Sequence, residues 1–185
     1  MRQDELIEPQ PSPYAPAIRH AFTQNDIELA RTLFLEYAHW LKVDLCFQGF
    51  DEELATLPGA YAHPRGRLLL AGNPNEAFAC IALRPLDSDA TGSHVEAFAE
   101  PADALVGEVK RLYVQPTHRG EGWGKRLAHQ LLEEARTIGY RELKLDTLSW
   151  MTAARALYAE LGFRECAPYY RNPLRDVVYM ALSLG

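Results

Sequence analysis

Residues 106–149 form the segment that most constrains the fold of this chain. The stretch VGEVKRLYV, residues 106–114, predicts a strand, and the amphipathic run at 122–139 predicts a helix. The stretch ELKLDTLS, residues 142–149, predicts a second strand. Two strands that are joined by a crossover helix lie parallel and have a right-handed connection. The segment therefore predicts a parallel pair of strands within a sheet.

A hairpin is predicted ahead of this unit. GRLLLAG and EAFACIALRPL, residues 66–72 and 76–86, flank the turn residues NPNE, which is typical of antiparallel strands. The sheet should therefore be mixed, in a fold of the α/β class. The other predicted elements are a short strand in AIRHAF (17–22), a long helix over 27–45 capped by Asn25 or Asp26, a short helix at 51–57, a helix at 151–162, and strands at 163–169 and 177–184.

The length of 185 residues suits one compact domain, which we expect to span residues 17–185. Residues 1–16 are expected to be a flexible lead-in, because their four prolines withhold backbone donors and block helix formation. The acidic stretch 87–103 is expected to be a surface loop. Loops of this length are uncommon in compact domains unless they are mobile or functional.

Charge and cysteine usage exclude several classes of protein. The 19 basic and 25 acidic side chains give a net charge of −6, which argues against non-specific binding to nucleic acid or to a membrane surface. Cys46, Cys80 and Cys166 lie far apart without zinc-ligand spacing, so we expect reduced core thiols and no metal site. No apolar run has the ~18 residues of a membrane span, and the expectation is a soluble, cytoplasmic protein.

Three alternating glycines, Gly120, Gly122 and Gly124, lie between the strand at 106–114 and the helix that follows it. The start of a helix exposes unpaired N–H groups at the positive end of the helix dipole, and glycines let an anion come close to them. His118, with Arg119 and Lys125, adds positive charge. The pattern favours a phosphate site, and the alternative is a tight turn with solvated charges.

The sequence of this loop does not match two common phosphate-binding motifs. A Walker loop requires a glycine five residues before Gly124, where Arg119 stands, and Ser or Thr after Lys125, where Arg126 stands. The dinucleotide fingerprint that begins at Gly120 requires a glycine at 125. Neither class of nucleotide site is therefore predicted.

The spelling RGEGWG after LYVQP, together with LYAELGF near the end of the chain, resembles the GNAT acyltransferase superfamily over residues 108–163. The resemblance implies a mixed, mostly antiparallel sheet of six to seven strands, splayed at the centre, with about four helices on its two faces. It also implies an N-acetyltransferase with acetyl-coenzyme A as co-substrate.

The resemblance places the coenzyme A pyrophosphate on the backbone of the glycine loop. The residues implied there are Arg119, Gly120, Glu121, Gly122, Trp123, Gly124 and Lys125. The side chain of Glu121 should face solvent, because a carboxylate would repel phosphate. The resemblance also implies that Leu112, Tyr113 and Val114 pair with the pantetheine arm as if it were an added strand, and that a backbone N–H near Leu112 stabilises the oxyanion.

Two catalytic side chains are implied. Tyr158 in LYAELGF resembles the tyrosine that protonates the departing thiolate, and the alternative is a half-buried helix tyrosine. Glu108 is the carboxylate that would take the amine proton, directly or through water. The alternative for Glu108 is a solvent-facing residue paired with Lys110 or Arg171. Family members often have asparagine where this chain has Met151, and Thr152 would supply a hydroxyl in its place.

The acceptor is predicted only as a primary amine of a small molecule or peptide, acetylated by direct attack because no cysteine lies in the motif region. Tyr37, Trp40, Tyr169 and Tyr170 are candidates for pocket walls, with plain core as the alternative. The acidic stretch 87–103 would suit a cationic acceptor, and two arginines near the C-terminus, Arg171 and Arg175, would suit a carboxylate. The sequence does not choose between these acceptors.

Two other readings remain open at this point. A non-catalytic module that senses acyl-coenzyme A or an amine would have the same motifs, and a nucleotide-binding protein would leave LYAELGF unexplained. A homodimer through the C-terminal strand or the first helix is also left open. Thiol release from acetyl-coenzyme A in the presence of amines separates an enzyme from a sensor.

Overall fold

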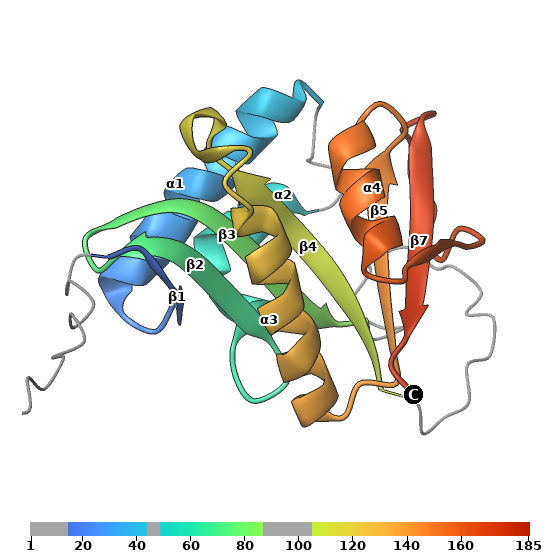
Figure 1. The fold of residues 1–185 in the computed structure, drawn as a ribbon, viewed down its shortest axis with the longest axis horizontal. Helices are drawn as coiled ribbons and strands as arrows, with labels where there is room; N and C mark the ends of the chain where they lie inside the picture. Colours follow the sequence, from blue (N-terminus) through green and yellow to red (C-terminus); the bar gives the residue numbers. More distant parts are fainter. Residues whose placement is uncertain (1–14, 44–48, 87–104) are drawn as a thin grey trace, which may run out of the picture.

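The computed structural model describes residues 15–43, 49–86 and 105–185, which form one mixed sheet with α-helices on both faces (Figure 1). The strands are β1 (Ala17–His20), β2 (Arg67–Asn73), β3 (Glu76–Pro85), β4 (Val106–Val114), β5 (Glu142–Leu148), β6 (Arg164–Glu165) and β7 (Val177–Ser183). The helices are α1 (Gln24–Leu41), α2 (Phe50–Thr56), α3 (Trp123–Ile138) and α4 (Thr152–Glu160), with 3-10 turns η2 (Gly59–Tyr61) and η3 (Pro116–His118).

The seven strands lie in the order β1-β2-β3-β4-β5-β7-β6. Every neighbouring pair is antiparallel except β4 and β5, which are parallel and connected through α3. Helices α3 and α4 cover one face of the sheet, and α1 and α2 cover the other (Figure 1). The fold class predicted from the sequence is confirmed.

The sheet opens between β4 and β5. Their pairing begins at Val106 opposite Glu142 and ends at Glu108 opposite Lys144. Beyond these residues the two strands diverge, as Figure 1 shows on the side where β4 ends. The splayed centre that the sequence predicted is therefore present, and it leaves the last residues of β4 without a strand on the β5 side.

The start of α1 differs from the prediction. Thr23 is the N-cap, and its hydroxyl accepts a hydrogen bond from the backbone N–H of Asp26 at 3.1 Å. The carboxylate of Asp26 accepts from the backbone N–H of Thr23 at 3.1 Å, which completes a capping box. The prediction of Asn25 or Asp26 as the cap was wrong, because Asp26 is the third helical residue and returns the bond.

The strand predicted at 163–169 is also shorter than expected. Strand β6 contains only Arg164 and Glu165, while Phe163 before it is buried in the core. Cys166 donates one more backbone hydrogen bond to Tyr179, and the chain then leaves the sheet ahead of Pro168, which has no N–H to donate. This departure carries the tyrosines that follow toward the site described below.

Several predictions fall on residues outside the described part of the chain. They are residues 1–14 of the expected lead-in, Cys46 and the acidic stretch 87–103. The long helix predicted over 27–45 ends earlier, at Leu41, because its C-cap residue Lys42 has φ +55°, a left-handed conformation that ends a helix. Of the other cysteines, Cys80 is buried and Cys166 is half-buried, and both are free thiols. No described helix has the length and apolar character to cross a bilayer.

Candidate active site

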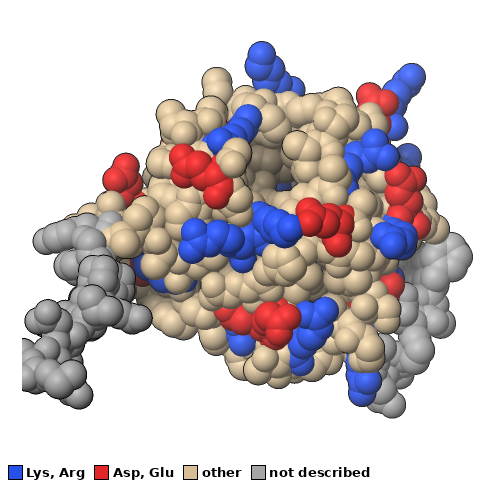
Figure 2. All heavy atoms as spheres, viewed as in Figure 1, with Lys and Arg blue, Asp and Glu red and all other residues tan. Residues whose placement is uncertain are grey.

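A cleft occupies the split between β4 and β5. It has about 600 Å³ of empty space, which includes space open to solvent. Viewed over α3 and α4, the surface is hollowed between these helices, and both basic and acidic side chains surround the hollow (Figure 2). The lining residues are Tyr37, Leu41, Val43, Val109, Lys110, Arg111, Leu112, Asp146, Thr147, Leu148, Met151, Ala154, Tyr158 and Leu174.

A bulge in β4 lies at the edge of this cleft. The register slips between Cys80 and Ala82 of β3, so that Arg111 and Leu112 together oppose Ile81. Arg111 has φ +58°, a left-handed conformation that a side chain other than glycine rarely adopts. Bulges bend and twist a strand, so this one accounts for the divergence of β4 from β5. It also brings the Leu112 backbone to the cleft.

An ion pair holds the bulged residue in place. The guanidinium of Arg111 donates two hydrogen bonds to Glu53 of α2, from Nε at 2.9 Å and from a terminal nitrogen at 2.5 Å. Burial opposes ionisation of Glu53, but the hydrogen bond and charge of Arg111 outweigh it, so the pKa of this carboxyl lies below its ordinary value. Helix α2 therefore stabilises the backbone conformation on which the cleft depends.

The glycine loop lies at the start of α3. Gly120 and Gly122 have φ of +85° and +82°, and a Cβ built on either would meet no atom within 4 Å. Gly122 is the N-cap of α3 and forms no side-chain cap, so the first N–H groups of the helix remain available. Open space beside uncapped amides is what a diphosphate needs, and the loop fits the cofactor that the sequence predicted.

The side chains of this loop point to other partners. Glu121 is 51% exposed, and its carboxylate accepts from the indole N–H of Trp123 at 3.0 Å. The Trp123 ring is buried against Phe78, and Lys125 pairs with Glu160 of α4. Exposure of Glu121 agrees with the prediction. What the loop offers a phosphate is therefore mainly backbone, with the charge of Lys125 nearby.

Strand β4 continues from the cleft toward this loop. Leu112 lines the cleft, whereas the ring of Tyr113 packs in the opposite core, 5.9 Å from the ring of Tyr37. The carbonyl of Val114 accepts a hydrogen bond from Nε of Arg119 at 3.0 Å. The strand residues predicted to meet the pantetheine arm are therefore contiguous with the cleft, although one acceptor is engaged by Arg119.

Tyr158 of α4 lies at the cleft and is only 7% exposed. Its ring contacts Phe163 edge to face, with centroids 5.6 Å apart. Burial raises the pKa of its hydroxyl above the ordinary value, so the group stays protonated at neutral pH. Within the described part of the chain this hydroxyl has no hydrogen-bond partner, which leaves it able to donate into the cleft.

Glu108 is buried and pairs with Lys110, one of the two partners expected if it has no catalytic role. It is 1% exposed, so the alternative of a solvent-facing residue was wrong, and Arg171 is not its partner. One carboxylate oxygen accepts from Lys110 Nζ at 3.3 Å and from the Tyr169 hydroxyl at 3.0 Å, and the other accepts from Arg84 at 2.7 Å. Glu108 does not line the cleft, so its role as a base stays a prediction that would need water as a carrier.

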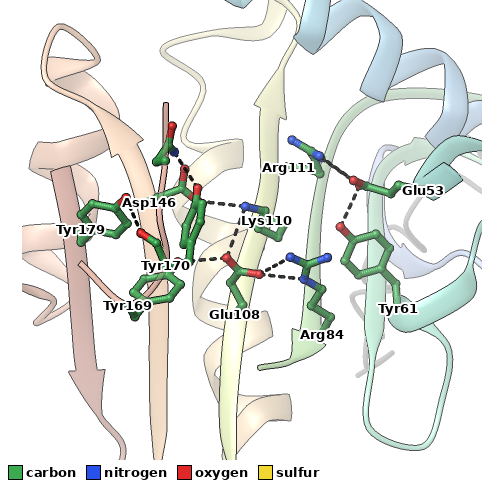
Figure 3. Close-up of polar contacts among 11 residues, drawn as sticks. Glu53, Tyr61, Arg84, Glu108, Lys110, Arg111, Asp146, Tyr169, Tyr170 and Tyr179 are labelled. Atoms are coloured by element: carbon green, nitrogen blue, oxygen red, sulfur yellow. Dashed lines mark hydrogen bonds and ion pairs between the residues drawn. The ribbon is translucent and has the colours of Figure 1, made fainter. Parts of the chain in front are cut away.

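Sequence reasoning did not identify Asp146, which lines the cleft from β5. Its carboxylate accepts from Lys110 Nζ at 2.9 Å and is hydrogen-bonded by the Tyr170 hydroxyl (Figure 3). Burial opposes its ionisation, but Lys110 and Tyr170 outweigh this effect and hold its pKa below the ordinary value. The sequence alone gave no signal for Asp146, because its place in the cleft depends on the pairing of β4 and β5, which ends at Glu108 and Lys144, two residues before Lys110 and Asp146.

The remaining candidates have varied positions. Tyr37 lines the cleft, whereas Trp40 packs against Tyr113 and the exposed Trp150. Met151 lines the cleft, and its sulfur accepts from the Thr147 hydroxyl at 3.6 Å. Thr152 is exposed at the start of α4. The histidines His39 and His63 and the arginines Arg171 and Arg175 are all exposed and lie outside the cleft lining.

Residues 30–163 match the Acetyltransferase (GNAT) family. An uncharacterized N-acetyltransferase of Schizosaccharomyces pombe is 34% identical over 162 residues, which cover 87% of this chain and 90% of the relative. An uncharacterized N-acetyltransferase of Dictyostelium discoideum is 29% identical, with 85% and 94% covered.

Solved structures show the same fold. An acetyltransferase of the GNAT family from Staphylococcus aureus has a TM-score of 0.69 at 19% identity, covering 92% of this chain and all of that one (100%). The yncA protein of Salmonella typhimurium, solved with its cofactor acetyl-CoA, has a TM-score of 0.64 at 21% identity, with 92% and 94% covered.

Proposed function

The chain belongs to the GNAT acetyltransferase family, and on that premise we propose that it transfers the acetyl group of acetyl-coenzyme A directly to a primary amine of a small molecule or peptide. One observation carries the proposal. The split between β4 and β5 opens a cleft that Leu112 and Tyr158 line, and β4 ends close to the uncapped start of α3, where a Cβ on Gly124 would lie 3.7 Å from the Val114 side chain. Uncapped amides that suit a diphosphate therefore lie near the end of the strand that borders the cleft, and a buried hydroxyl that could donate a proton lines the cleft itself.

The glycine loop would bind the cofactor. The backbone N–H groups of residues 120–125 would donate to the diphosphate, and Lys125 would add charge. The exposed edge of β4 at Leu112 and Val114 would pair with the pantetheine amides, as a strand pairs with its neighbour. Since Arg119 engages the carbonyl of Val114, complete pairing there requires Arg119 to release it. When bound, the cofactor supplies a thioester carbonyl that an amine can attack.

The residues of the cleft would then complete the transfer. The amine nitrogen forms the new bond to the acetyl carbon as the carbon–sulfur bond breaks, and Tyr158 gives its proton to the departing thiolate. The N–H of Leu112 would donate to the carbonyl oxygen as negative charge develops there. Glu108 would receive the amine proton through water, since it lies just behind the lining residue Lys110.

Direct transfer is supported by the positions of the described thiols. Cys80 is buried, and its sulfur donates to the carbonyl of Arg111 at 3.3 Å. Burial raises the pKa of this thiol above its ordinary value, which disfavours the nucleophilic thiolate. Neither Cys80 nor Cys166 is among the described residues that line the cleft, so neither is placed to carry an acetyl group.

Thiol release tests the proposal. Acetyl-coenzyme A is mixed with the protein and a panel of aryl amines, polyamines, amino acids and peptides, and free thiol is followed against samples without amine. We expect thiol release that depends on at least one amine, with a matching acetylated product. Tight cofactor binding with no amine-dependent release from any class would favour an acyl-coenzyme A sensor and contradict the proposal.

A further inference from the structure

The charged groups around the cleft form a chain that ends in a carboxylate. Arg84 of β3 pairs with Glu108, Glu108 with Lys110, and Lys110 with Asp146 (Figure 3). Positive and negative charges alternate along this chain, from Arg84, which is 23% exposed, to Asp146 at the cleft. A ligand in the cleft would therefore meet the carboxylate of Asp146 beside the cation Lys110 that pairs with it.

The two basic residues of the lining already have anionic partners. Arg111 donates two hydrogen bonds to Glu53, and Lys110 lies between Glu108 and Asp146. An anionic group that approached Lys110 would meet two carboxylates within hydrogen-bond distance of the same ammonium. The lining is therefore poorly suited to a carboxylate ligand, although it contains two cations and one anion.

Asp146 retains capacity to bind a cation. A carboxylate has about four acceptor sites, and Lys110 and Tyr170 account for two of them in Asp146. Its side chain is 13% exposed and faces the cleft. The lowered pKa keeps it ionised at neutral pH. An ammonium group of a ligand could therefore form a charge-assisted hydrogen bond with it.

Several other residues that line the cleft are apolar, and Tyr37 and Thr147 add hydroxyl groups. Leu41 and Val43, at and just beyond the end of α1, face it together with Leu174 of the segment before β7. These residues belong to the core on the α1 and α2 face, whereas Tyr158 belongs to the core on the α3 face. A ligand that reaches Asp146 from the α1 side would therefore place an apolar body against these side chains.

We propose that Asp146 binds the ammonium group of the acceptor, and that the acceptor is a small amine with an apolar body and no carboxylate beside the amine. The inference rests on the proposed function and deepens it. Asp146 acts here as a specificity residue that holds the acceptor before attack. The amine proton would still pass through water to Glu108, because the lowered pKa of Asp146 makes its carboxylate a weak base.

Steady-state kinetics with matched acceptors test the inference. 2-Phenylethylamine and phenylalanine differ by one carboxylate, and we expect wild-type kcat/KM to favour 2-phenylethylamine by about tenfold or more. Asp146→Asn should raise KM for 2-phenylethylamine by about tenfold or more with a smaller change in kcat, while calorimetry shows unchanged coenzyme A binding. The control Glu133→Gln alters an exposed carboxylate on α3 and should change none of these values.

A measurement on the wild-type protein covers the case in which Asp146→Asn does not fold. N,N-dimethyl-2-phenylethylamine is a cation and 2-phenylethanol is neutral, and the cation should inhibit at about tenfold lower concentration. Equal inhibition by the two compounds, an unchanged KM in a folded Asp146→Asn, or a preference for phenylalanine would each overturn the inference alone. Absence of turnover with every amine would overturn the proposed function and this inference together.

Discussion

Tyr158 combines two properties that a proton donor for a thiolate needs. It is buried at the cleft, and its raised pKa keeps it protonated over the range in which amines become nucleophilic. We predict that Tyr158→Phe lowers kcat by about 100-fold, the lower end of what a general acid contributes. The affinity for coenzyme A should stay nearly the same, because the phosphate contacts that we propose are made by the glycine loop and not by Tyr158.

Tyr140 provides the control for this variant. It is buried in the same core, and its hydroxyl donates to the backbone carbonyl of Arg65 at 3.0 Å, outside the cleft lining. Tyr140→Phe should retain wild-type kcat. If Tyr158→Phe also retains it, Tyr158 has no part in proton transfer.

Glu108 is tested by the pH profile. Without a carboxylate to receive the amine proton, Glu108→Gln should need a higher pH for activity, where more of the amine is already neutral. The measurement is kcat/KM against pH, with Glu134→Gln as a control for a half-buried carboxylate that pairs with Arg67 outside the cleft. Identical profiles for wild type and Glu108→Gln would leave Glu108 as a structural partner of Arg84 and Lys110.

These residues differ in how well the sequence could identify them. The glycine loop and Tyr158 lie in local motifs, so the sequence was sufficient to name them as candidates, and Tyr158 lines the cleft. Of the partners of Glu108, Lys110 lies two residues away on the same strand and was predicted, whereas Arg84 and Tyr169 come from separate parts of the chain and were not. Asp146 was not identified either, because its position at the cleft depends on where the pairing of β4 and β5 ends.

Among the elements, α2 matters more than its length suggests, because Glu53 holds Arg111 at the bulge. We predict that Glu53→Gln lowers the free energy of unfolding at pH 7 by about 3–5 kcal/mol, as for other broken buried pairs. Glu165→Gln, in an exposed pair with Arg155, is the control and should have little effect.

The same carboxyl sets a pH dependence. The folded pKa of Glu53 lies below its ordinary value of 4.5, so its contribution is fully present above pH 4.5 and is lost as the pH falls through the folded pKa. Chemical denaturation from pH 7 to pH 3 should therefore show a smaller loss of stability in Glu53→Gln than in wild type. Parallel curves would show that the ion pair does not stabilise the folded state.

Element boundaries were predictable where the signal was local. Alternation and helical periodicity predicted β4 and α3 closely, and glycines mark both ends of α3. The cap of α1 and the length of β6 were not predicted, because one depends on a reciprocal bond between Thr23 and Asp26 and the other on the departure of the chain from the sheet.

For the whole molecule, the central claim is that the uncapped amides at the start of α3 hold a diphosphate and so direct a thioester into the split sheet. Gly122→Val tests it, because the Cβ position of Gly122 is open in the protein alone and a bound phosphate would fill that space. Gly139→Val is the matched control. Gly139 has φ +100° with equally open space at the other end of α3, so it carries a similar backbone strain away from the site.

The direct measurement is calorimetric titration of coenzyme A into folded wild type, Gly122→Val and Gly139→Val. We predict that Gly122→Val weakens binding by about tenfold or more, a loss of at least ~1.4 kcal/mol, while Gly139→Val binds as wild type does. Equal affinity of all three proteins would contradict the claim that this loop holds the cofactor.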